Sequence, residues 1–218
     1  HPPNLSYNPS FPSLGLMARR SDRAETGTAW IISPTSGTLV NAGANITVKV
    51  GTSGAINLVL LVSDTGVTTG TVTSDFDVSI PADWLGAYPI VMVGFAGGTV
   101  TEISSIDLQV TTSAKLVSLR TSPPTLLSAD KGEKTNFWVI GTFSDGVDRN
   151  VTASTQGTQY LIANPAIATV AADGVIEGKQ VGKTALTIAN NGLMTTLVIV
   201  VMGDDMTKNS ALNWSLYH

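Results

Sequence analysis

The chain of 218 residues has 43% hydrophobic but only 13% charged residues, and its formal net charge is −4. A phosphate-binding groove would need clustered Lys and Arg, so this composition argues against nucleic acid as a partner. The absence of cysteine excludes disulfides, thiolate metal sites and cysteine nucleophiles. No apolar run approaches the roughly 20 residues of a membrane-spanning helix, so no direct membrane span is expected.

Residues 1–27 predict an extended N-terminal arm. They contain four of the ten prolines, and their apolar residues follow neither the helical nor the strand period. The sequence begins at His1-Pro2-Pro3, without an initiator Met or a signal peptide. We therefore expect a processed product or a piece of a longer protein.

Residues 28–111 predict a first β-sandwich. Short runs rich in β-branched residues alternate with clusters of Gly, Ser, Thr and Asp, at the spacing of about 8 to 12 residues that is typical of sandwich strands. No amphipathic helix is expected. The runs are Trp30–Ile32, Asn45–Val50, Ile56–Val62, Phe76–Ile80, Tyr88–Phe95 and Ile103–Val110.

Residues 112–202 predict a second β-sandwich with a different charge balance. The first segment has six acidic side chains and Lys49 alone as a base, whereas the second has seven basic and six acidic side chains. This contrast favours two separate domains over one large one. The second set of runs is Leu116–Leu119, Thr135–Phe143, Ile167–Val170, Gly174–Ile176, Thr184–Ile188 and Thr195–Val201.

Residues 203–218 lose the strand pattern and predict a C-terminal tail. The tail and the arm carry more apolar side chains than solvated linkers usually do. We therefore expect the arm, the tail or both to mediate assembly, by pairing with open sheet edges of a neighbouring subunit or of another protein partner. The alternative is a disordered linker left by processing. The residues expected to interact are Tyr7, Phe11, Leu16, Trp214 and Tyr217.

The segment from Leu116 to Val201 resembles the bacterial Ig-like group 2 (BIG2) module, known from surface proteins of the intimin and invasin type. The resemblance implies an all-β, Ig-like sandwich. The residues that carry it are Val117–Leu119, Ser122–Pro124, Lys131-Gly132, Gly141–Thr152 (GTFSDGVDRNVT), Gly157–Tyr160, Asn164–Val170, Asp173–Val175 and Gly182–Ile188.

Two Asp-Gly pairs within this module predict tight turns. Gly accepts positive φ, and an Asp side chain can accept hydrogen bonds from nearby amides. Asp145-Gly146 and Asp173-Gly174 are therefore each expected to join two antiparallel strands. Gly182 is expected where the chain approaches a neighbour closely.

The first segment resembles bacterial Ig-like modules in a more general way, through Trp30–Gly37 and through Ile80–Ile90. In the second stretch the resemblance implies a corner, and the hydroxyl of Tyr88 is expected to hold that corner from the inside.

No catalytic, cofactor or metal residue is predicted. The two histidines are His1 and His218, so no internal imidazole is available for a Ser-His-Asp triad. A copper site built on His1 would need the second His beside it, and we interpret both ends as exposed termini. The pairs Asp75/Asp77 and Asp204/Asp205 could offer oxygens to Ca²⁺ between domains but lack the run of ligands of a calcium loop.

The sequence thus predicts two tandem Ig-like β-sandwiches with terminal arms, forming a non-catalytic structural or adhesive module of a bacterial surface or secreted assembly. Extracellular or cell-surface location is expected, with the periplasm as the alternative. The rival hypothesis is an accessory portion of a larger secreted hydrolase, acting as a spacer or binding carbohydrate through Trp84 or Trp214.

Overall fold

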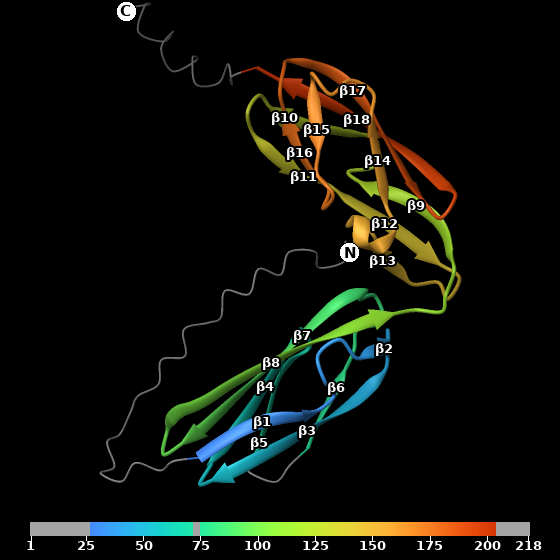
Figure 1. Ribbon diagram of the computed structural model, residues 1–218. Coiled ribbons are helices and arrows are strands. Elements are labelled where there is room, and N and C mark those ends of the chain that lie inside the picture. The colour runs from blue at the N-terminus through green and yellow to red at the C-terminus, as the bar shows by residue number, and fades with distance from the viewer. Residues whose placement is uncertain (1–26, 72–74, 204–218) are drawn as a thin grey trace, which may run out of the picture. The chain divides into compact units, whose positions relative to one another are not determined.

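The computed structural model describes residues 27–71 and 75–203. The chain divides into two compact units between Ser113 and Ala114 (Figure 1). Apart from one 3-10 turn, η1 (Ser154–Gln156), the regular structure of the described residues consists of β-strands. The predicted all-β class, with two tandem Ig-like β-sandwiches, is confirmed.

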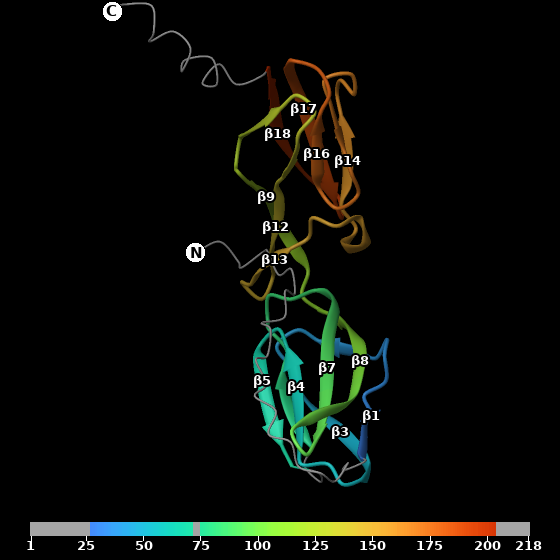
Figure 2. The same cartoon turned by 90° about the vertical axis from the view of Figure 1, so that its left-hand side faces the viewer.

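The first unit contains a three-stranded and a five-stranded sheet. The smaller sheet has the order β1 (Gly27–Ser33), β3 (Asn45–Gly54), β6 (Phe76–Ser79). The larger has the order β2 (Leu39–Asn41), β8 (Thr99–Thr111), β7 (Gly86–Ala96), β4 (Leu58–Ser63), β5 (Gly66–Gly70). Strands β4, β5, β7 and β8 lie side by side in Figure 2. Neighbouring strands are antiparallel except β2 and β8, which are parallel.

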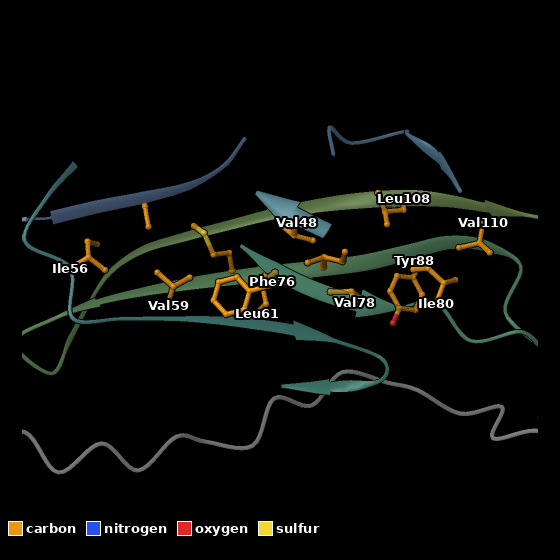
Figure 3. Packing of buried hydrophobic residues seen from close by; sticks show 13 residues of the cluster. Val48, Ile56, Val59, Leu61, Phe76, Val78, Ile80, Tyr88, Leu108 and Val110 are labelled. Carbon is orange, nitrogen blue, oxygen red and sulfur yellow. The ribbon is translucent and has the colours of Figure 1, made fainter. Parts of the chain in front are cut away.

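The core of the first unit forms because alternate residues of a strand point to one face. In β7, Tyr88, Ile90 and Met92 are buried, and in β4, Val59 and Leu61 are buried. They join residues of the smaller sheet in one cluster, which Figure 3 shows from close by. The members from the smaller sheet include Ala29, Val48, Phe76 and Val78.

The second unit contains three sheets. The four-stranded sheet has the order β10 (Leu126–Asp130), β18 (Leu193–Met202), β17 (Gly182–Asn190), β14 (Gln159–Ile162). The others have the orders β13 (Asp148–Asn150), β12 (Trp138–Phe143), β9 (Leu116–Ser122) and β11 (Lys134–Asn136), β16 (Val175–Gly178), β15 (Ala168–Val170). Here β10 and β18 form the parallel pair. Fully buried side chains from several of these strands fill the interior: Val139, Ile140, Ile176, Leu186, Ile188, Leu197 and Ile199.

The run Thr135–Phe143, expected as one strand, is two strands in different sheets. Strand β11 ends at Asn136 and pairs with β16, whereas β12 begins at Trp138 and pairs with β9 and β13. Phe137, which separates them, is 1% exposed. A chain that changes sheets at a buried aromatic residue keeps the apolar run unbroken, so the sequence pattern does not reveal the switch.

Candidate functional site

The hairpin between β12 and β13 carries a buried arginine. Asp145-Gly146 lies in the turn of this antiparallel hairpin, and Gly146 has a φ of 78°. Arg149 donates two hydrogen bonds to Asp145, from Nη1 to Oδ1 (2.9 Å) and from Nη2 to Oδ2 (2.7 Å), although the Arg149 side chain is only 2% exposed. Its guanidinium carbon also lies 4.9 Å from the centre of the Phe143 ring. This turn is therefore fastened to the interior of the second unit.

A second ion pair crosses the same sheet. Arg120 of β9 donates to Asp148 Oδ2 (2.8 Å), and the hydroxyl of Thr142 donates to Asp148 Oδ1 (2.6 Å). The Thr142 hydroxyl, and after it Arg120, lower the pKa of Asp148. Both ends of the pair are about half exposed, so we expect it to add little stability.

The second unit should lose stability as the pH falls from about 4 toward 2. Hydrogen bonds from Arg149 lower the pKa of Asp145 to about 2. In the unfolded chain the pKa of this carboxyl is about 4, so as the pH falls the unfolded chain binds the proton before the folded chain does. Proton binding therefore favours unfolding. The contribution of Asp145 is therefore complete above pH 4 and is lost as the pH falls through 2.

Urea unfolding between pH 2 and 5, followed by NMR signals of the second unit, measures this loss. The Asp145→Asn variant should show a shallower dependence on pH over the same range, because it lacks the titrating carboxyl. An unchanged pH dependence in that variant would show that other carboxyls are responsible.

A buried network of polar side chains, the polar knot, links η1 with β13, β14 and β17. The side-chain amide of Asn190 donates to the carbonyl of Gln156 and to the hydroxyl of Thr158, both at 2.9 Å. The Thr158 hydroxyl in turn donates to the carbonyl of Val151. Because Thr158 and Asn190 are both buried, these bonds are made away from water, where losing one is costly.

Tyr160 and Thr152 continue the polar knot. The Tyr160 hydroxyl donates to the carbonyl of Thr152, and the amide of Val139 donates to the Thr152 hydroxyl (2.8 Å). The Tyr160 ring meets that of Phe137 edge to face at 5.8 Å. Burial, and to a smaller extent the negative charge of Asp173, raises the pKa of Tyr160. The hydroxyl therefore keeps its proton and can donate a hydrogen bond to the Thr152 carbonyl. These contacts give the residues a structural role.

Gly174 and Gly182 lie where the second unit packs closely. Asp173-Gly174 is in the turn of the antiparallel β15–β16 hairpin. Gly174 has a φ of 81°, and a Cβ placed on it would overlap the Thr152 methyl carbon. At Gly182, where β17 begins, a Cβ would lie 3.1 Å from Cδ1 of Ile167. Gly174 thus leaves no room for a larger residue, whereas a Cβ at Gly182 would require Ile167 to shift by a few tenths of an ångström.

The corner before β7 in the first unit is closed by Trp84, and not by the hydroxyl of Tyr88 as expected. The Trp84 indole N–H donates to the Ala87 carbonyl (2.9 Å) and closes the corner, while its ring packs edge to face on Tyr88 at 5.4 Å. The Tyr88 hydroxyl instead lies 3.5 Å from that of Thr65, in the β4–β5 turn. Trp84 therefore serves packing. Trp30, which the sequence did not indicate as an interaction residue, has a more exposed side chain than Trp84, at 44%, and its indole lies over Gly51.

Of the carboxylate pairs noted in the sequence, Asp75 and Asp77 lie within the described residues. Asp77 accepts a hydrogen bond from Thr47 (2.8 Å), and Asp204/Asp205 lie outside the described residues. Within residues 27–71 and 75–203, no group of three or more His, Asp or Glu could hold a metal ion. Burial, and after it the charge of Asp83, raise the pKa of Asp64.

The outer face of the four-stranded sheet in the second unit is the candidate interaction surface. In β18, Leu197, Ile199 and Val201 are buried, so the alternate residues point outward. Cross-strand pairing places Leu126 beside Val198, and Leu161 beside Thr187 and Thr196. Leu161 and Met194 are 70% and 69% exposed. We name this surface the β18 face; its apolar members are Leu126, Leu161, Ala185, Ala189, Met194, Val198, Val200 and Met202.

The charged residues that share the β18 face within these four strands are Asp130 and Lys183, which have opposite signs. An exposed sheet face with so little charge and several large apolar side chains is typical of a surface that packs against another protein. The sequence did not indicate this face. The interaction residues that it did indicate, Tyr7, Phe11, Leu16, Trp214 and Tyr217, lie outside the described residues.

No protein-family model and no curated protein sequence matches the chain. Among solved structures, the extracellular domains 3–5 of Drosophila OTK match with a TM-score of 0.41 and 13% identity, covering 83% of this chain and 68% of that one. Domains 1–6 of the surface layer protein SbsC match with a TM-score of 0.36 and 15% identity, covering 73% and 24%. The titin domains z1z2, in complex with telethonin, match with a TM-score of 0.32 and 13% identity, covering 83% and 98%.

These likenesses concern the fold alone. Within the part of the chain that the structure describes, no helix is long and apolar enough to cross a membrane.

Proposed function

We propose that this chain is a non-catalytic structural or adhesive module of a bacterial surface or secreted assembly, and that it works by subunit assembly. The observation that carries the proposal is the β18 face, where Leu161 and Met194 are more than two-thirds exposed on a sheet with little charge. Residues 28–111 and 112–202 are the two proposed domains, and the second is a BIG2-like module. An extracellular or cell-surface location follows from this proposal.

The proposed occupant of the β18 face is the same face of a second copy. Two identical surfaces can pack about a twofold axis only where like charges do not meet. Asp130 and Lys183 lie at the same end of the β18 face and have opposite signs, so a twofold pairing can bring one against the other. Exposed methionines such as Met194 and Met202 adapt their shape to an opposing surface.

Substituting Leu161→Glu and Met194→Glu together should weaken self-association at least about tenfold, because two buried carboxylates would lose their hydration at the interface. Sedimentation equilibrium of the full chain measures this. The matched control is Val117→Glu, at a residue of β9 that is 58% exposed and lies outside the β18 face. A chain that stays monomeric at hundreds of micromolar, or equal association of all variants, would contradict the proposal.

The terminal segments are proposed as additional contributors to assembly. Sedimentation equilibrium of chains that lack residues 203–218, or residues 1–27, measures how much each segment contributes to self-association apart from the β18 face. Loss of association only on deletion would place the interface in those segments and would contradict the role of the β18 face.

A further inference from the structure

In the five-stranded sheet of the first unit, strands β7 and β4 are apolar on both faces. In β7, Ile90 and Met92 enter the core, yet the intervening Val91 and Val93 are also apolar. A strand of this kind is typical of a sheet that is covered on both sides, whereas a sheet with one face in water shows alternation. No described residue outside the sheet is shown to cover the second face.

Cross-strand pairing gathers the outward residues into two adjacent rows. One row runs Ile103, Val93, Leu60 and Thr69, and the other runs Ser105, Val91, Val62 and Val67. Six of these eight residues are apolar: Ile103, Val93, Leu60, Val91, Val62 and Val67. The four inner members are half-buried, while Ile103 and Val67 at the margins are 64% and 61% exposed. We name these six residues the β7 patch; they lie on the strands that are side by side in Figure 2.

We infer that residues 1–26 of the same chain lie across the β7 patch and cover it. They join the first unit at Gly27, whose Cα approaches Ala55 and Ile56 so closely that a Cβ would overlap them. Ile56 lies just before β4, which contributes Leu60 and Val62 to the patch. The arm therefore joins the smaller sheet at the end of the sandwich where β4 begins, one sheet separation from the patch.

The arm is long enough to reach every part of the patch. The eleven residue-to-residue steps from Leu16 to Gly27 span up to about 36 Å when extended, which exceeds the sum of a sheet separation of about 10 Å and six strand residues of about 20 Å. The β7 patch is thus within reach of Leu14, Leu16 and Met17, and the earlier Tyr7 and Phe11 can extend across it.

Composition favours this occupant. No Asp, Glu, Lys or Arg precedes Arg19, so the first 18 residues can be placed on apolar surface without burying a charge. The remainder of the arm has three Arg against Asp22 and Glu25, and faces a unit with six acidic side chains and Lys49 as its single base between residues 28 and 111. Four prolines lack an amide donor, which favours packing on the face over pairing at an edge.

Engineered cysteine pairs test the inference in the full chain, which contains no other thiol. Leu16→Cys with Ile103→Cys should form an intramolecular disulfide on mild oxidation at least about tenfold faster than Leu16→Cys with Ile32→Cys, because docking raises the effective concentration of the two thiols. Ile32 is a fair control, since it is 54% exposed, lies in the other sheet of the same unit, and is nearer to Leu16 along the chain.

Phe11→Cys and Leu14→Cys, each paired with Ile103→Cys, allow for a different register along the patch. Mass spectrometry and mobility under non-reducing conditions distinguish the products. Equal rates for all three arm positions and the Ile32 control would overturn the inference. Disulfide-linked dimers would also overturn it, by showing that the arm of a second copy occupies the patch.

A second measurement uses Ile103→Cys alone. Its reaction with a thiol reagent should accelerate several-fold when Tyr7, Phe11, Leu14 and Leu16 are all changed to Ser, and circular dichroism should report an unchanged fold. No acceleration would overturn the inference. Neither result alters the sedimentation test of the β18 face, so failure of one proposal is distinguishable from failure of the other.

Discussion

Replacing Gly174 with Ala is expected to lower the free energy of unfolding of the second unit by about 3 kcal/mol or more. A φ of 81° strains any residue with a Cβ, and this Cβ would also overlap Cγ2 of Thr152. Thr152 has little freedom to move, since its carbonyl accepts from Tyr160 and its hydroxyl accepts from the amide of Val139. Urea unfolding followed by NMR signals of the second unit measures the loss.

Gly146→Ala is the matched control for this substitution. Gly146 has nearly the same φ, 78°, but no atom lies within 4 Å of an added Cβ. Backbone strain alone should then cost about 1 kcal/mol. Losses of equal size at the two glycines would contradict the argument, because the overlap with Thr152 would have no measurable cost.

Replacing Asn190 with Leu is expected to cost about 2 kcal/mol. Leu fills a similar volume but donates nothing, so the Gln156 carbonyl and the Thr158 hydroxyl each lose the hydrogen bond from Asn190. Asn190 is 7% exposed and Thr158 is 1% exposed, which limits replacement by water. The 3-10 turn η1 should also loosen, and amide exchange of Gln156 and Gly157 should accelerate in this variant.

Tyr160→Phe is the variant with which the loss of stability in Asn190→Leu should be compared. It removes one hydrogen bond, to the Thr152 carbonyl, from the same polar knot and should cost about 1 kcal/mol. If Asn190→Leu proves no more destabilising than Tyr160→Phe, the two bonds of Asn190 do not have the importance that the polar knot implies.

Long strands were predictable from the sequence because their own residues identify them. Thr184–Ile188 and Tyr88–Phe95 alternate or run apolar over many positions, and they lie within β17 and β7. Strand β5 (GVTTG) was not predicted, and β13 (DRN) was expected only as the strand after the Asp145-Gly146 turn. Each is a short edge strand of its sheet, and edge pairing depends on the partner strand more than on the edge's own residues.

The candidate surfaces could not be predicted, for a related reason. Leu161 and Met194 lie on the same face only because β14 and β18 both pair with β17. The register of that pairing cannot be read from the order of the residues in the sequence. The burial of Arg149 against Phe143 and Asp145 could not be predicted either, because the residues next to Arg149 in the sequence are those of an ordinary polar turn. The turns were predictable because Asp-Gly acts locally.

The parallel pairs β2–β8 and β10–β18 determine how each unit responds to a force that pulls on its ends. A pull on the two ends of the second unit reaches β10 through β9. Once β9 had separated from β12, the pull would act on β10 at Leu126 and on β18 at Met202, in opposite directions along the same ladder. The hydrogen bonds of that ladder would then be loaded together in shear, and could not open one after another like a zipper. The same geometry holds for Leu39–Asn41 against Gln109–Thr111 in the first unit. In each unit, this parallel ladder would therefore resist tension along the chain in shear.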